Sequence, residues 1–185
     1  MAGSAKKKAK AGEIQLLFMD ESTLTLHPVL RKCWMKRGKQ RRIPAAGQQK
    51  LHHLFAAYDY LTGQVFCMDA KAKNSQAFVL FLEYLMTQVS TSLPIVLVLD
   101  NASYHHSAMA EAALACLEDE GLFAYWLPPY CSNLNLIERF WAYLKAFACA
   151  DKLFASVSAL LDSVRRCLHH QNDLSASDRL LFLKT

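Results

Sequence analysis

The hydrophobic positions of the chain first predict short buried strands. Residues 13–21 (EIQLLFMDE) and 94–100 (PIVLVLD) are apolar runs that end in an acidic residue, which is typical of strands buried on both faces. A hairpin is predicted where two β-rich arms flank the turn residue Gly63. A last run stops at paired prolines, which fit poorly in regular structure. The predicted strands are 13–21, two arms within 50–70, 94–100 and 122–128.

Longer segments carry apolar residues at helical spacing. The clearest begins with an Asn/Ser cap at residues 74–75, and its apolar positions recur every three or four residues at Phe78, Phe81, Leu82, Leu85 and Met86. A second predicted helix, residues 107–121, ends at Gly121. The predicted helices are 74–90, 107–121, about 133–147 and 155–171.

The order of these elements predicts the fold class. Three antiparallel strands followed by strand–helix alternation predict an α/β fold with a mixed five-stranded sheet. In this sheet strands 1–3 are antiparallel, strands 4–5 are parallel, and helices flank both faces. We expect one folded domain at 14–171, between a flexible basic tail at 1–13 and a C-terminal extension at 172–185.

Composition narrows the class of protein. The chain has 185 residues, 53% of them hydrophobic and 20% charged, which is typical of a globular domain. Its apolar runs are too short to span a bilayer, so we expect no membrane association. Six scattered cysteines without paired spacing, and no secretory signal, favour reduced thiols in the cytoplasm.

The net charge of +5 is concentrated in one segment, residues 31–42 (RKCWMKRGKQRR). No acid interrupts it, and it contains Trp34 and the turn residue Gly38. A solvated loop is one interpretation, and a surface that follows a phosphate backbone is the other. The basic residues expected to contact DNA are Arg31, Lys32, Lys36, Arg37, Lys39, Arg41 and Arg42.

Two of the predicted strands place an aspartate where a site is expected. Asp20 and Asp100 follow apolar runs, and if these strands are parallel neighbours both carboxylates emerge at one sheet edge. Two close carboxylates repel each other unless a proton or cation lies between them. Oxygen ligands of this kind suit Mg²⁺.

A third carboxylate, Glu138, lies near the start of the predicted helix 133–147. Leu134, Ile137, Trp141 and Leu144 form a stripe on that helix, and Glu138 borders it. Three carboxylates would suffice for a two-metal site that activates an attacking oxygen and stabilises a leaving one. The alternative is that the aspartates cap turns and the glutamate favours a helix start. Competing acids are Glu21, Asp59 and Asp69, although Glu21 should point away from Asp20 along a strand.

Three sequence blocks then carry a resemblance to a known family. They are FMDES at 18–22, VLDNASYHHS at 98–107 and LPPYCSNLNLIERFWAYLK at 127–145. The chain resembles the catalytic domain of DDE transposases in the mariner superfamily, in their bacterial insertion-sequence branch. Family positions retained in the last block are Leu127, Pro128, Pro129, Tyr130, Leu134, Asn135, Ile137, Glu138, Trp141 and Lys145.

The resemblance implies an RNase H-like fold and a Mg²⁺-dependent endonuclease and polynucleotidyl transferase. It implies that Asp20, Asp100 and Glu138 are the catalytic residues and bind two Mg²⁺ ions, with Mn²⁺ able to substitute. The implied reaction is cleavage at transposon ends and transfer of the freed strand to target DNA, that is, DNA recombination in the bacterial nucleoid. The resemblance also implies that Asn101 and His105 either contact the metal ligands from behind or lie near DNA, and DNA contacts are expected for Asn101, His105 and Lys145.

Roles for two of these conserved-motif positions stay open. His105 is either a residue near DNA or a helix-start histidine without a catalytic role. For Asn135 we favour a local turn or cap residue over direct chemistry.

The chain also departs from the family pattern. Cys131, Ser132 and Asn133 replace serine, proline and aspartate, and Leu136 replaces a proline that would help to start the helix. No helix-turn-helix module fits before Asp20, so we expect half of a split element, a truncated copy or a trimmed chain. Partners considered are DNA, a separate helix-turn-helix subunit or upstream-frame product, and a second copy in a homodimer.

Three functions compete on this reading. The first is a transposase catalytic domain. The second is a nuclease of the same fold that does not transpose. The third is a truncated or repurposed transposase remnant that binds DNA without catalysis.

Overall fold

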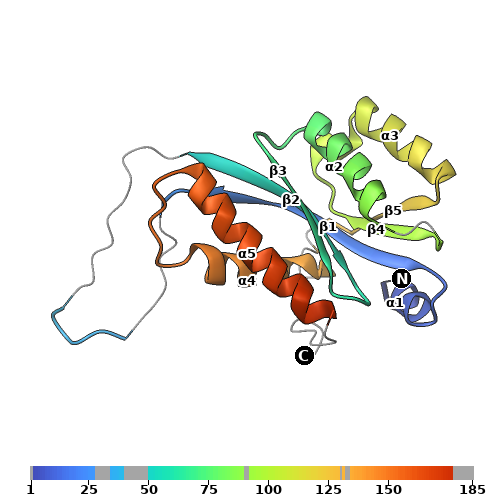
Figure 1. Cartoon of the computed structure of the whole chain (residues 1–185). Helices are drawn as coiled ribbons and strands as arrows, with labels where there is room; N and C mark the ends of the chain where they lie inside the picture. The colour runs from blue at the N-terminus through green and yellow to red at the C-terminus, as the bar shows by residue number, and fades with distance from the viewer. Residues whose placement is uncertain are drawn as a thin grey trace.

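The computed structural model describes residues 2–27, 34–39, 50–89, 92–129, 131 and 134–176. A five-stranded sheet runs through the molecule, with helices against both of its faces (Figure 1). The elements are α1 (Ala2–Lys10), β1 (Gln15–Thr25), β2 (Leu51–Asp59), β3 (Val65–Ala70), α2 (Ser75–Gln88), β4 (Ile95–Leu99), the 3₁₀ turn η1 (Ser103–His106), α3 (Ala108–Asp119), β5 (Leu122–Trp126), α4 (Ile137–Leu144), the π-helical turn η3 (Lys145–Cys149) and α5 (Val157–Ala176).

The strand order in the sheet is β3-β2-β1-β4-β5. β1 pairs antiparallel with β2, and β2 with β3, whereas β4 is parallel to both β1 and β5. The prediction of antiparallel strands 1–3 and parallel strands 4–5 is confirmed. The hairpin turn is also where it was expected, because Gly63 has a φ of 71° that glycine adopts easily.

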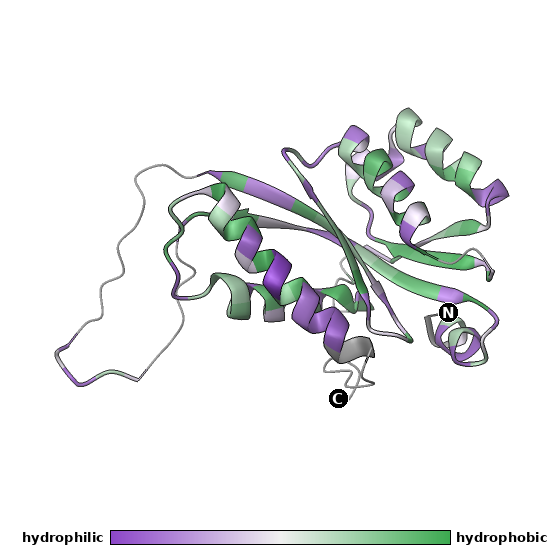
Figure 2. Cartoon of the chain, viewed as in Figure 1, coloured by the Kyte–Doolittle hydropathy of each residue, from purple (hydrophilic) through white to green (hydrophobic). Residues whose placement is uncertain are grey.

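Alternation along the strands divides the core into two layers. In β1 the side chains of Leu16 and Phe18 pack with α4 and α5, whereas Leu17 and Met19 pack with α2 and α3 on the other face. Figure 2 shows the strands mostly hydrophobic and α5 with hydrophilic residues on the side turned to the viewer. The central strands are therefore buried on both sides, as their apolar runs predicted.

The N-terminal segment differs from the expected flexible tail. Residues Ala2–Lys10 form α1, whose Ala9 is fully buried against the sheet. The Lys6 ammonium lies 6.0 Å from the ring centroid of Phe18 and 5.7 Å from that of Tyr60. Alanine and lysine are strong helix formers, and the small alanine side chains allow the helix to pack closely. The prediction of a flexible tail considered only the charge of this segment and not its helix propensity.

Three further boundaries differ from the prediction. β1 continues to Thr25, so Asp20 lies inside the strand and not at its end. α4 begins at Ile137, four residues later than expected, and Leu134 is 44% exposed and outside the buried stripe. α5 also continues past residue 171, the expected domain boundary, to Ala176.

In the described part of the chain, no helix combines the length and apolar character needed to cross a membrane. The cysteines described there are free.

Candidate active site

Three carboxylates from separate elements line one cleft of about 370 Å³. Asp20 comes from β1, Asp100 directly follows β4, and Glu138 is the second residue of α4. The remaining wall is formed by Asn101, Ala102, Leu127, Pro128, Pro129, Cys131 and Asn135. The structure therefore brings together the three acids that the sequence singled out.

The strand register explains why Asp20 and Asp100 meet. The parallel ladder between β1 and β4 ends at the pair Phe18–Val98, and each aspartate lies two residues further along the chain. Because β4 stops and β1 continues with β2, the cleft opens at the carboxyl end of β4 beside the middle of β1.

Asp20 is held in a setting that disfavours its charged form. The indole Nε1 of Trp141 donates a hydrogen bond to Asp20 Oδ2 over 3.1 Å. Burial raises the pKa of Asp20 to about 7, with further contributions from the charges of Glu21, Glu138 and Asp100. A cation among these carboxylates would relieve that repulsion.

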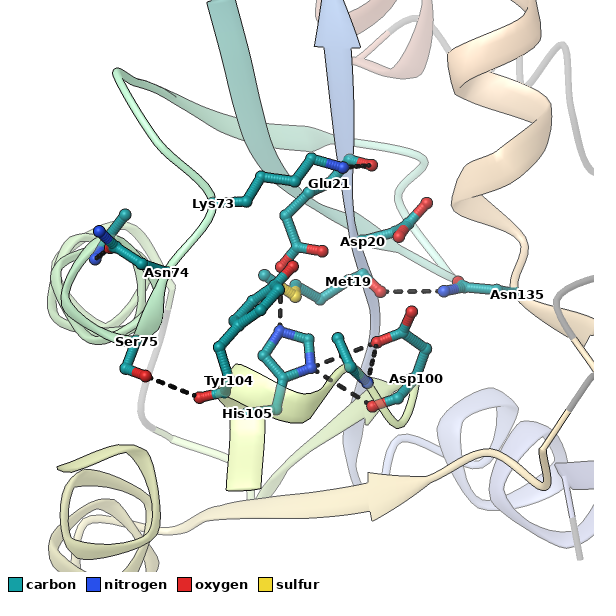
Figure 3. Close-up of polar contacts among 12 residues, drawn as sticks. Met19, Asp20, Glu21, Lys73, Asn74, Ser75, Asp100, Tyr104, His105 and Asn135 are labelled. Carbon is teal, nitrogen blue, oxygen red and sulfur yellow. Dashed lines mark hydrogen bonds and ion pairs between the residues drawn. The ribbon is translucent and has the colours of Figure 1, made fainter. Parts of the chain in front are cut away.

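Asp100 has the opposite electrostatic setting. Its Oδ1 accepts the backbone N–H of Ala102 at 3.1 Å and lies 3.2 Å from His105 Nδ1. The hydrogen bond from His105 lowers the pKa of Asp100, against the effect of partial burial. Figure 3 shows Asp100 beside the His105 ring and on the same side of the sheet edge as Asp20.

His105 lies between two carboxylates inside the protein. Its Nε2 is 3.0 Å from Glu21 Oε1, while Nδ1 faces the side chain and the backbone oxygen of Asp100. Burial alone would lower its pKa, but the hydrogen bonds to Asp100 and Glu21 raise it to about 9. The ring is 1% exposed, so the expected DNA contact of His105 is ruled out by burial.

Two asparagines fix the loops around the cleft. Asn135 is buried, and its Nδ2 donates to the Met19 carbonyl, 2.9 Å away, next to Asp20 (Figure 3). The Asn135 carbonyl also accepts the Glu138 N–H, which is the expected local role, and the side-chain bond adds a link from the loop before α4 to β1. Asn101 donates from its side chain to the Leu127 carbonyl, which ties the end of β4 to the loop that starts at Pro128.

Glu138 is solvent-exposed in the first turn of α4. Its backbone N–H donates to Asn135 O at 3.2 Å, so the same asparagine that contacts β1 also starts the helix. Among the described residues, no three His, Cys, Asp or Glu side chains are arranged to hold a metal ion as they stand. The three acids line one cleft without converging on one point.

Only some of the basic residues expected to contact DNA lie within the described residues. Lys36, Arg37 and Lys39 are exposed beside Trp34, in a turn where Gly38 has a φ of 79°. Lys145 is half-buried at the start of η3 and does not line the cleft. Arg31, Lys32, Arg41 and Arg42 lie outside the described residues.

The other acids weighed from the sequence have structural roles. Asp59 accepts hydrogen bonds from Gln15 and from the backbone of Leu61 and Thr62, which caps the hairpin turn. Asp69 pairs with His52 at 3.2 Å, away from the cleft. Neither lines the cleft.

Sequence reasoning missed two contacts of the site. Trp141 was expected only as core, yet its N–H reaches Asp20; its position three residues after Glu138 placed it on the same helix face, a usable signal. The pairing of Glu21 with His105 spans 84 residues and had no local signal.

Comparisons with known proteins agree with this geometry. The family model described as DDE superfamily endonuclease matches residues 15–161. The insertion element IS630 uncharacterized 39 kDa protein of Shigella sonnei is 28% identical over 155 residues, which are 84% of this chain and 45% of that protein. The chain thus spans less than half the length of this curated relative.

Solved structures share the fold. The Mos1 transposase paired-end complex with left transposon end matches with a TM-score of 0.62 at 18% identity, covering 98% of this chain and 60% of that chain. The mariner Mos1 paired end complex with Mg matches with a TM-score of 0.60 at 17% identity, covering 96% and 58%. The predicted RNase H-like fold is confirmed, and so is the predicted membership in the DDE superfamily. The chain belongs to the DDE superfamily endonuclease family.

Proposed function

We propose that the chain is the catalytic domain of a DNA transposase, which cuts DNA strands at transposon ends and transfers them to target DNA with the help of divalent metal ions. The observation that carries this proposal is the cleft lined by Asp20, Asp100 and Glu138 from three different elements. Membership in an endonuclease family supports the reaction class.

The residues present fit a divalent cation. All three side chains offer carboxylate oxygens, which Mg²⁺ and Mn²⁺ prefer. Burial raises the pKa of Asp20 most, and the charges of Glu21, Glu138 and Asp100 raise it further; a cation in the cleft would offset those charges. We propose two ions held by Asp20, Asp100 and Glu138; when bound, they would lower the pKa of an attacking hydroxyl and stabilise the leaving oxygen.

The chain's own groups would prepare the site. In the described residues, the bonds that hold Asp100 use Oδ1, which leaves Oδ2 for the cleft. Trp141 holds one oxygen of Asp20, and Asn135 fixes the loop before α4, the helix that carries Glu138. Each acid is thus oriented by a contact that comes from another element.

DNA is the proposed substrate and partner. The exposed Lys36, Arg37 and Lys39 supply the positive charge that a phosphate backbone needs. We extend this role to Arg31, Lys32, Arg41 and Arg42, which continue the same run in the sequence, and to Asn101 and Lys145. A helix-turn-helix partner, a second copy of the chain, and a bacterial nucleoid location complete the proposal.

The test compares single carboxylate variants of the full chain on supercoiled plasmid and on linear DNA with free 3′ ends. Wild type is expected to nick and join DNA only with Mg²⁺ or Mn²⁺, whereas D20N, D100N and E138Q should lose at least about 100-fold of the rate. DNA binding, measured by fluorescence anisotropy, should stay within about threefold because the phosphate-binding lysines are intact.

The matched control is D69N, because Asp69 is an aspartate of the same sheet that does not line the cleft. It should cut like wild type. The remnant hypothesis predicts instead that wild type binds DNA, cuts nothing with either metal, and does not change when Asp100 is replaced. Cleavage that persists in D100N would also contradict the proposed site.

A further inference from the structure

We propose that Glu21 and His105 are positioning residues that hold Asp100 by one oxygen and so aim its other oxygen into the cleft. The inference builds on the proposed function, in which Asp100 is a metal ligand. It assigns a task to Glu21, an acid adjacent to Asp20 that does not line the cleft.

The geometry forms a continuous chain from β1 to the end of β4. Glu21 Oε1 lies 3.0 Å from His105 Nε2, and His105 Nδ1 lies 3.2 Å from Asp100 Oδ1 (Figure 3). The side chains of Glu21 and His105 are 3% and 1% exposed, whereas that of Asp100 is 47% exposed. The first two are therefore inside the protein, and only the third reaches the cleft.

Strand alternation separates the two adjacent acids. Asp20 faces Trp141 of α4, so Glu21 must face the opposite layer, where α2 and η1 lie. Lys73 Nζ also donates to the Glu21 backbone oxygen at 3.1 Å, which fixes the main chain on this side. The Glu21 side chain therefore lies against His105, which contacts Asp100.

Packing fixes the orientation of the imidazole ring. Its centroid lies 4.3 Å from that of Phe78 and 4.6 Å from that of Tyr104, with the Tyr104 ring edge-on. Ser75 Oγ donates to the Tyr104 carbonyl and so anchors η1 to the start of α2. A ring held in this way has one direction in which to present Nδ1.

Both ring nitrogens face oxygen atoms that can accept a hydrogen bond. Glu21 offers a carboxylate, and Asp100 offers a carboxylate and a carbonyl oxygen, all of which accept. His105 and the Ala102 N–H both contact Asp100 Oδ1, so the half-exposed Asp100 side chain cannot rotate freely. Because 1% exposure keeps the ring from substrate, His105 acts through Asp100 and is not a catalytic residue.

The test uses two neutral replacements that separate the two ends of the ring. In H105N the amide nitrogen occupies the place of Nδ1 and can still donate to Asp100; in H105Q it reaches the place of Nε2 and can donate only to Glu21. Both remove the same charge. We measure the Kd of Mn²⁺ for the full chain by electron paramagnetic resonance, and the Mn²⁺ concentration for half-maximal plasmid nicking, both at pH 7.5.

H105N, which keeps the donor to Asp100 but loses the contact with Glu21, should bind Mn²⁺ about threefold more weakly than wild type, whereas H105Q, which loses the donor to Asp100, should bind about 10-fold or more weakly, the usual scale for removing a partner of a metal ligand. E21Q, which keeps an oxygen acceptor for Nε2, should lie close to wild type, and E21L, which removes the same contact as H105N, should lie close to H105N. S163A is the matched control, because Ser163 is buried and its hydroxyl donates to the Ala148 carbonyl far from the cleft.

Thermal unfolding of every variant separates positioning from folding. Equal Mn²⁺ affinities for H105N and H105Q, or a loss that follows melting temperature and appears in S163A as well, would overturn the positioning role. If wild type binds Mn²⁺ normally, that result leaves the proposed function intact. Wild type that binds no Mn²⁺ and cuts no DNA would overturn the proposed function and the positioning role with it.

Discussion

At the scale of single residues, neighbouring acids in β1 have opposite surroundings. Asp20 borders the cleft and lies against Trp141, whereas Glu21 is buried on the other face against His105. The two side chains are one residue apart in the sequence, yet the pleat of the strand assigns one to the proposed chemistry and the other to its support.

The raised pKa of Asp20 predicts a trade between stability and function. Its folded-state pKa is about 7 and its usual value 3.8, so the folded chain binds the proton more tightly than the unfolded chain. The stability from this group is present at low pH and is lost as pH rises from about 4 to 7. D20N cannot ionise, and at pH 8 without divalent ions it should be more stable by about 1–2 kcal/mol.

Differential scanning calorimetry at pH 5.5 and pH 8 measures this effect. The melting temperature of D20N should exceed that of wild type by roughly 2–8 °C at pH 8 and by less at pH 5.5. D69N serves as the control because Asp69 is half-exposed and paired with His52. A D20N variant less stable than wild type at pH 8 would refute the predicted repulsion.

At the scale of elements, α4 is positioned by the loop before it. Among the described residues, no side chain caps its start at Leu136, and Asn135 instead binds β1 and accepts a hydrogen bond from the N–H of Glu138. Leu136 stands where the family pattern has proline, and its φ of −65° is the value a proline ring imposes.

L136P should therefore be accepted at this position. Compared with L136A, which removes the same apolar contact without restricting the backbone, L136P should be more stable by about 0.4–1 kcal/mol through a smaller unfolded-state entropy. Urea unfolding followed by tryptophan fluorescence gives the difference. A lower stability of L136P than L136A would mean that the start of α4 needs the residue-136 N–H or a different backbone angle.

At the scale of the whole molecule, the cleft lies where the two core layers and the strand ends meet. β1 contributes to both layers, β4 ends beside it, and α4, which lies on one face of the sheet (Figure 1), supplies Glu138 to the cleft. Binding of an ion there would link three elements that are otherwise joined through the core.

Divalent ions should accordingly raise the melting temperature of the chain. An ion present at ten times its Kd adds about 1.4 kcal/mol, or roughly 3–6 °C for a domain of this size. Thermal unfolding with 10 mM Mg²⁺ or Mn²⁺ at constant ionic strength measures the shift. D100N and E138Q should lose most of it and D69N should keep it; equal shifts in all variants would place the ions elsewhere.

Much of this protein was determined by its sequence alone. Buried strands, the hairpin at Gly63 and the capped helix α2 follow from local periodicity and turn chemistry, and each appears within a few residues of its predicted place. The sheet topology followed from the order of elements, because parallel strands need crossovers and hairpins do not. Asp20 and Asp100 were singled out because each follows an apolar run, and Glu138 because it borders an apolar stripe, although Asp20 lies inside β1 and not at its end.

The tertiary structure decided what depends on contacts between distant segments. The Glu21–His105–Asp100 chain, the Asn135–Met19 bond and the Trp141–Asp20 bond join residues between 5 and 121 positions apart. Helix boundaries moved for the same reason, since α4 starts where the Asn135 bond to β1 allows it. Hydrophobic periodicity reports which face of an element is buried, but only the packed sheet and helices determine which polar groups then meet.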